Sequence, residues 1–185
     1  MTAGAHQPGA EARGARGVVH AIAREMAEGR IPAGDQAALR REKLGPAFWR
    51  LAVRHLEPAG LLGPEGSPWR QEGERRWAAI VSNLAHAGHC HAPDRRLGAA
   101  LAAADIAEAR VLRLARAQGD RLLPAVRAVA HQLISGGHRA DWADFADLIL
   151  SDGRPWHADV RRRLCLDYYR AQARPAREPH DEEES

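Results

Sequence analysis

Residues 95–120 read RRLGAALAAADIAEARVLRLARAQGD, and this stretch decides the class of fold. Alanine and leucine, which favour helices, dominate it, and Gly119 ends the run. On a helix turning about 100° per residue, Arg110, Arg113 and Arg116 cover an arc of roughly 120°. The neighbouring arc is apolar and consists of Ala107, Val111, Leu114 and Ala115. We name Arg110, Arg113 and Arg116 the arginine stripe, a pattern that suits a partner carrying a row of phosphates.

Composition favours helices throughout the chain. The 185 residues are enough for one domain with a substantial core. They include 38 alanines and few β-branched residues, so strands have little to build with. We therefore expect an all-α protein, a single compact bundle of about nine helices.

The chain carries no signal for a membrane or an oxidising compartment. Two cysteines, Cys90 and Cys165, are too few for a disulfide framework, and we expect Cys165 to act as a small buried hydrophobic residue. No apolar run reaches about 18 residues, and the first residues lack the apolar centre of a secretory signal. These observations predict a cytoplasmic protein that does not span a membrane.

Apolar spacing and turn residues predict the individual helices. Asp105, Asp120 and Asp141 each precede a helical run and are expected to be N-cap residues, Asp105 with Glu108 in a variant of the capping box. We expect one helical domain, residues 16–173, between a disordered segment 1–15 and a disordered acidic tail 174–185. The predicted helices span residues 18–28, 35–41, 46–56, 72–87, 95–103, 106–117, 121–135, 142–149 and 159–173.

Charge is distributed unevenly. The formal net charge is +3, but residues 178–185 hold five acidic side chains, so residues 1–177 carry +8. The basic residues are 26 arginines and one lysine, Lys43, a bias that a GC-rich coding sequence explains in large part. A basic body of this kind favours an acidic partner such as nucleic acid.

Two clusters could support other chemistry. His86, His89, Cys90 and His91 are good zinc ligands within six residues, but no second ligand pair follows at zinc-motif spacing. Asp141, Asp144 and Asp147 recur every third residue and could act as acid–base groups or bind Mg²⁺. We expect Asp141 to be a helix cap, the other two aspartates to lie on a solvated face, and the histidines to occupy a solvated loop. No phosphate-binding glycine loop, nucleophile elbow or His-Glu-x-x-His motif occurs, so neither an enzyme nor a cofactor is expected.

The arginines outside the stripe are the other candidates for nucleic-acid contacts. Singly, each is best explained as a surface ion pair, but together they could form a track for a phosphate backbone. We expect Arg40, Arg41 and Arg127 to lie alongside the stripe. The candidate nucleic-acid-binding residues are Arg40, Arg41, Arg75, Arg76, Arg96, Arg110, Arg113, Arg116, Arg127 and Arg154.

Several motifs carry a family resemblance. Residues 96–102 (RLGAALA) followed by 108–114 (EARVLRL) resemble the CasB family, the small subunit of the type I-E CRISPR Cascade complex. Further pieces occur in the family's order, and the resemblance covers about residues 18–172. These pieces are residues 34–41 (GDQAALRR), 48–51 (FWRL), 141–142 (DW) and 167–169 (DYY).

The resemblance implies an all-helical, non-catalytic subunit that packs head to tail with a second copy. It implies contacts with the backbone and large subunits of Cascade, with the crRNA and target DNA, and with the displaced non-target strand. Arg75 or Arg76 falls near a basic position of the family. The arginines of this chain that match basic positions of the family directly are Arg41, Arg110, Arg116, Arg127 and Arg154. The N-terminal segment, the acidic tail and the cluster from His86 to His91 depart from the family pattern.

Two alternatives stay open at the level of sequence. A protein–protein scaffold would use its arginines at subunit interfaces, where arginine is enriched. A small zinc-dependent enzyme would use the loop from His86 to His91.

Overall fold

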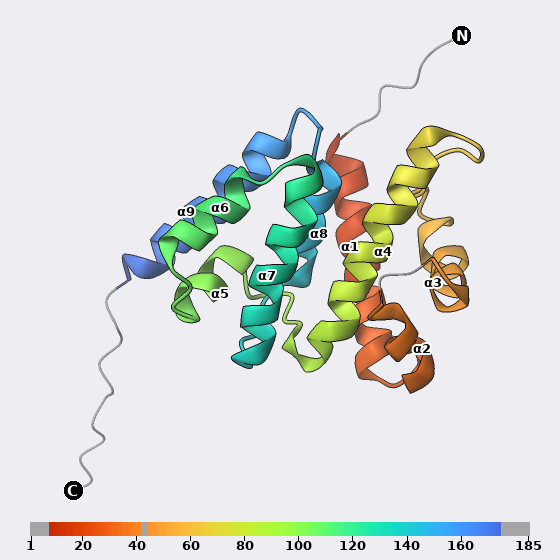
Figure 1. Ribbon diagram of the computed structural model, residues 1–185, viewed down its shortest axis with the longest axis horizontal. Coiled ribbons are helices and arrows are strands. Elements are labelled where there is room, and N and C mark those ends of the chain that lie inside the picture. Colours follow the sequence, from red (N-terminus) through yellow and green to blue (C-terminus); the bar gives the residue numbers. More distant parts are fainter. Residues whose placement is uncertain (1–7, 42–43, 175–185) are drawn as a thin grey trace, which may run out of the picture.

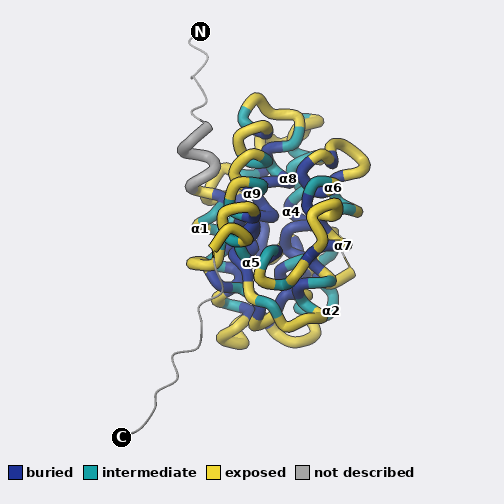
Figure 2. The backbone as a smooth tube through the Cα atoms, turned by 90° about the vertical axis from the view of Figure 1, so that its left-hand side faces the viewer, coloured by how far each residue is buried: buried dark blue, intermediate teal, exposed yellow. Residues whose placement is uncertain are grey.

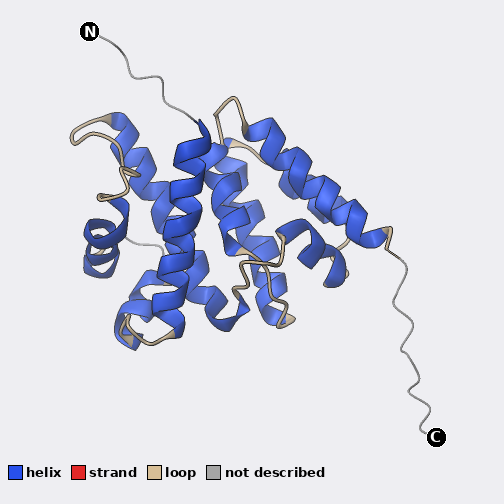
Figure 3. Ribbon diagram, turned by 180° about the vertical axis from the view of Figure 1, so that it is seen from behind, coloured by secondary structure: helices blue, strands red, loops and turns tan. Residues whose placement is uncertain are grey.

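The computed structural model describes residues 8–41 and 44–174, and of residues 8–13 the backbone alone. Within these ranges the chain forms nine α-helices, and the single strand-like pairing is a bridge between His91 and Ala140 (Figures 1 and 3). The all-α prediction is therefore confirmed. No described helix combines the length and the apolar character that crossing a lipid bilayer requires.

The helices follow one another with short connections. Three segments of other helix type are the π-helical turn η1 (Ala52–Leu56) and the 3₁₀ turns η2 (Gly88–Cys90) and η3 (Gly119–Arg121). The α-helices are α1 (Pro8–Ala27), α2 (Ala33–Leu39), α3 (Pro46–Leu51), α4 (Pro68–Ala87), α5 (Leu97–Ala103), α6 (Glu108–Arg116), α7 (Leu122–Ser135), α8 (Trp142–Ser151) and α9 (His157–Gln172).

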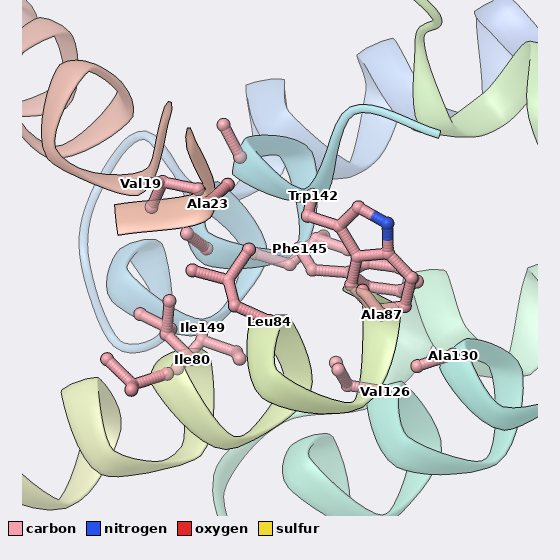
Figure 4. Packing of buried hydrophobic residues seen from close by; sticks show 14 of the residues in the cluster. Val19, Ala23, Ile80, Leu84, Ala87, Val126, Ala130, Trp142, Phe145 and Ile149 are labelled. Atoms are coloured by element: carbon pink, nitrogen blue, oxygen red, sulfur yellow. The ribbon is translucent and has the colours of Figure 1, made fainter. Parts of the chain in front are cut away.

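Helix α8 is the centre of the core. It contacts α1, α4, α5, α7 and α9, and each residue from Trp142 to Ile149 is buried. The Trp142 and Phe145 rings lie 5.1 Å apart, and Figure 4 shows them in a cluster with side chains of α4 and α7 that include Leu84 and Val126. Buried segments occupy the interior, whereas the surrounding turns are exposed (Figure 2). A helix that is enclosed on all sides is expected to be apolar around its whole circumference. The residues of α8 fit this expectation except for its aspartates.

Two helices begin earlier than the sequence predicts. Helix α1 starts at Pro8 rather than residue 18, while residues 1–7 lie outside the described ranges. Buried Ala15 shows that this part of α1 packs on the core. Helix α4 starts at Pro68 rather than residue 72, because the Ser67 side chain caps it by accepting the Arg70 N–H at 3.2 Å.

Two of the three predicted N-caps are wrong. Asp141 does cap α8, accepting the Ala143 N–H at 3.0 Å. Asp120 lies inside η3, and α7 begins beyond it without a side-chain cap. Asp105 instead ends α5: it has a φ of +51°, its N–H donates to the Ala102 carbonyl, and the Ile106 N–H donates to the Leu101 carbonyl at 3.0 Å. This pattern is a Schellman motif, which uses Asp105 as a C-terminal stop.

Candidate nucleic-acid interface

The arginine stripe lies on the outer face of α6. The helix packs against α7 and α9. Val111, Leu114 and Ala115 of the predicted apolar arc are buried, whereas Ala107, expected on the same arc, is exposed just before the helix begins. All three stripe arginines are exposed. Arg110, Arg113 and Arg116 make no hydrogen bond or ion pair with any residue in the described ranges. Their positive charge is therefore available to a partner.

The C-terminal end of the stripe borders α9. The two helices run antiparallel, because the Tyr169 hydroxyl donates to Glu108 at 2.7 Å while Arg116 lies near Cys165. Burial raises the pKa of the Cys165 thiol, and the charges of Arg116 and Arg161 oppose that rise. Arg161 therefore adds positive charge beside the stripe, at a position that sequence reasoning did not assign to the site.

Arg96 is half-buried and pairs with two aspartates. Its guanidinium lies 3.1 Å from the Asp144 carboxylate and 3.2 Å from that of Asp167. These contacts link the start of α5 to α8 and α9. Neutralised on both sides, Arg96 has little charge to offer a phosphate.

Arg76 likewise stabilises the fold, and Arg75 is exposed beside it. Arg76 pairs with Glu72 at 2.7 Å and donates to carbonyls at the end of α8, including that of Asp152 at 2.9 Å. It therefore satisfies carbonyl groups that α8 leaves without helical partners. Arg75 lies 3.6 Å from Glu72, with 71% of its side chain exposed.

Arg40 and Arg41 do not lie alongside the stripe, which corrects the prediction. They follow α2, and α2 and α6 lie toward opposite ends of the long axis of the molecule (Figure 1). Arg40 donates to the Ala85 carbonyl at 2.9 Å and so ties α2 to α4. Arg127 is exposed on α7, the helix beside α6, and has an interaction partner of its own.

A buried cluster of charges was missed by the sequence reasoning. Arg16 of α1 donates to Asp144 at 2.8 Å, to Asp147 at 2.7 Å and to Asp141. The predicted solvated face is therefore wrong, because these aspartates are exposed by only 0–8%. The sequence did contain a signal for buried acidic groups, namely three aspartates on one side of an otherwise apolar helix. The residues near them in the sequence, however, do not identify Arg16 as their partner.

The cluster joins four helices. Besides Arg16, Asp147 pairs with Arg163 of α9 at 3.0 Å, and Asp144 accepts the Leu97 N–H of α5 at 2.8 Å. Burial raises the pKa of Asp141 and Asp147 although Arg16 opposes the shift. Burial alone would lower the pKa of Arg16, but its hydrogen bond to Asp144 and the aspartate charges outweigh it, so this pKa is raised. The arrangement stabilises the fold and leaves no carboxylate open for acid–base chemistry.

The predicted histidine cluster does not converge on one site. His86 and His89 are exposed, whereas Cys90 is buried. His91 turns instead toward α1, where its Nε2 lies 3.0 Å from Nδ1 of His20, with the Asp141 carboxylate 3.9 Å from His20. His20, His91 and Asp141 lie close enough together to share a metal ion.

The hydrogen bonds around His91 do not fit a metal ion. The Trp142 N–H donates to His91 Nδ1 at 3.3 Å, so the proton of neutral His91 is on Nε2 and points at His20. A metal at Nε2 would require the proton on Nδ1, against the Trp142 N–H. Burial lowers the pKa of His91 to about 4, with contributions from the charges of His20, Arg139 and Arg16. The structure therefore favours a hydrogen bond from the Nε2 of neutral His91 to His20 over a metal site.

Comparison with known proteins identifies the family. The family model for CRISPR-associated protein Cse2 matches residues 35–169, which include α3 to α8 and most of α2 and α9. No curated protein and no solved structure matches the chain. The helical fold and the extent of this match agree with the motif-based resemblance. The chain belongs to the Cse2 (CasB) family, the small subunit of the type I-E CRISPR Cascade complex.

Proposed function

We propose that this Cascade subunit binds the sugar–phosphate backbone of the crRNA–target region and of the displaced strand through the arginine stripe, and so stabilises the R-loop. The observation that supports this function is the row of exposed, unpaired guanidinium groups on α6. Arginine forms strong bidentate hydrogen bonds with phosphate. The contacts carry no sequence information, because base pairing with the guide reads the sequence.

A small binding surface is enough to stabilise an R-loop, because R-loop formation is close to balanced in free energy. The heteroduplex that forms is about as stable as the DNA duplex it replaces, so modest contacts can tip the exchange. We propose a purely binding role without catalysis, in association with the backbone and large subunits and a second copy of the chain. Association with other Cascade components follows from the family.

The salt dependence of DNA binding tests the stripe. We expect the triple variant Arg110→Gln, Arg113→Gln, Arg116→Gln to bind single-stranded DNA more weakly and to reduce the magnitude of the log–log salt slope by about 2, since each phosphate contact contributes about 0.7. The control is Arg24→Gln, Arg50→Gln, Arg54→Gln, which removes the same charge from exposed positions on α1, α3 and η1. Equal slopes for the two triple variants would contradict the proposal.

Assembled Cascade provides the functional readout. We expect the stripe variant to assemble normally and to give an R-loop that dissociates faster than that of the control complex. Normal R-loop lifetime in a fully assembled variant complex would show that the stripe has no role in strand binding.

A second surface favours protein contacts. Three large apolar side chains are exposed here: Leu44, just before α3, by 42%, Trp49 of α3 by 38%, and Val53 of η1 by 62%. Trp49 and Phe48 form a T-shaped ring pair 5.1 Å apart, which holds Trp49 in place. We propose that this apolar surface contacts another Cascade subunit, and we expect Val53→Asp to impair assembly but not DNA binding by the isolated subunit. Unimpaired assembly would overturn this assignment.

A further inference from the structure

A cleft lies at one end of the bundle, and Arg16, Asp147 and Arg163 of the buried charge cluster form part of its lining. Its volume is about 910 Å³, and its walls come from α1, the turn at residues 60–64, the first turns of α4, the end of α8 and the start of α9. Apolar side chains such as Leu62, Leu150 and Val160 line it together with Trp69, Trp77 and Trp156. An apolar concavity with a few polar groups is the usual form of a ligand site.

The rim of the cleft carries an aromatic–cation stack. The Arg154 guanidinium lies 5.7 Å from the ring centroid of Trp69 and 6.0 Å from that of Trp156. Trp69 is 70% exposed, which is unusual for so large an apolar side chain. Arg154 makes no ion pair with a residue in the described part of the chain, so its charge is not neutralised.

Unlike Arg154 at the rim, the charged groups further inside the cleft are mostly paired with one another. Its other arginines are already paired: Arg16 and Arg163 with Asp147, and Arg76 with Glu72. Asp159 adds an exposed carboxylate without a partner in the described ranges. The lining holds four arginines and four carboxylates, so it has no surplus positive charge for a phosphate, whereas a flat ring with N–H donors could stack on indole and donate to a carboxylate.

The turn that follows the arginine stripe contacts the turn at the rim of the cleft. Beyond Arg116, the Gly119 N–H donates to the Asp152 carboxylate at 2.9 Å, which joins the turn after α6 to the turn that holds Arg154. Both turns lie at the upper edge of the molecule in Figure 1. A strand that follows the stripe toward its C-terminal end therefore arrives at the Trp69–Arg154–Trp156 stack.

We propose that this cleft receives an unpaired nucleobase of the single strand bound along α6. The inference rests on the proposed function and adds to it a base-stacking site. The base stacks on Trp69 inside the cleft, and the adjoining phosphate stays at the rim with Arg154. Base stacking on an aromatic side chain is independent of sequence, so the site holds the strand in place without reading it.

A pair of DNA probes tests the cleft separately from the stripe. Binding of the full-length protein is measured for a short single-stranded DNA and for the same DNA with abasic sites, which keep the phosphates but remove the bases. We expect the abasic DNA to bind more weakly, and Trp69→Ala to weaken binding of the intact DNA by about 5- to 100-fold while leaving the abasic DNA unaffected. His89→Ala, a change at an exposed ring outside the cleft, is the control and should bind both DNAs normally.

The outcomes are distinguishable. If the wild-type protein fails to bind either DNA, the proposed function fails and the cleft proposal falls with it. If the stripe variant weakens binding of both DNAs but Trp69→Ala changes neither, strand binding stands and the base site is overturned. If Trp69→Ala instead impairs only Cascade assembly, the cleft is a protein contact and the proposal is likewise overturned. Trp69→Phe, which keeps an aromatic ring for stacking, should retain most of the wild-type affinity for the intact DNA.

Discussion

Gly98 of α5 lies directly against the backbone of Leu164 in α9. A Cβ atom at position 98 would be 2.7 Å from the Tyr168 nitrogen, 2.8 Å from the Asp167 Cβ and closer still to the Leu164 carbonyl oxygen. The two helices therefore approach as closely as their backbones allow, which also explains the glycine within the RLGAALA motif.

Gly98→Ala is expected to lower the free energy of unfolding by about 1–3 kcal/mol, because α5 must move away from α9. Urea denaturation monitored by circular dichroism measures this change. The control is Gly17→Ala in α1, where an added Cβ meets no atom within 4 Å. That variant should be slightly more stable than the wild type, since alanine favours helices, and equal stability losses in the two variants would refute the close approach.

Arg16→Met is expected to destabilise the protein by about 3–5 kcal/mol at neutral pH, because buried Asp144 and Asp147 lose a shared partner. The loss should shrink as the pH falls, because protonation removes the uncompensated carboxylate charge. Urea titrations at neutral and mildly acidic pH test both statements. Arg163→Met, which removes a single and more exposed ion pair with Asp147, should cost less.

The half-buried His91 should make stability depend on pH. Its pKa is lowered from 6.5 to about 4, so the unfolded chain binds a proton between these values while the folded chain does not. The free energy of unfolding therefore falls as the pH is lowered through this window, by about 1–2 kcal/mol given the partial exposure of the ring.

His91→Gln isolates that contribution. The raised pKa values of Asp141 and Asp147 act in the opposite direction, and the neighbouring charges of His20, Arg139 and Arg16 are common to both proteins. As the pH falls from 6.5 to about 4, the free energy of unfolding of the wild type should therefore decrease more than that of His91→Gln. A constant difference would show that His91 is protonated as readily in the folded state as in the unfolded state.

Asp105→Gly is expected to stabilise the protein by about 0.5–1 kcal/mol, because glycine adopts the left-handed conformation at the end of α5 without steric cost. Asp105→Val should destabilise it, since a β-branched side chain is strained there. Thermal unfolding of the two variants provides the comparison. A loss of stability in Asp105→Gly would mean that the carboxylate, rather than the backbone, is what matters at this position.

Zinc should leave the stability of the protein unchanged. The Trp142 N–H fixes the tautomer of His91 and directs its Nε2 proton at His20, so coordination would break both hydrogen bonds. Thermal unfolding with and without zinc, on protein lacking an affinity tag, measures this directly. An increase in the unfolding temperature that His20→Ala abolishes would instead establish a metal site.

The sequence alone determined the features that depend on neighbours along the chain. Helical periodicity predicted the helix over residues 72–87 that lies within α4, and the exposed stripe beside an apolar arc on α6. The motifs also led to the family that the comparison then identified. Alanine content and spacing are local properties, so they act whatever the rest of the fold does.

Only the tertiary structure decided which charges remain available. Arg76 and Arg96 resemble stripe residues in sequence, yet α8 and its aspartates neutralise or occupy them, whereas Arg110, Arg113 and Arg116 face solvent. Arg16 meets its aspartates across 125 to 131 residues of chain, and Trp69 meets Arg154 across 85 residues. Such partners are selected by the packing of whole helices, and helical periodicity carries no information about that packing.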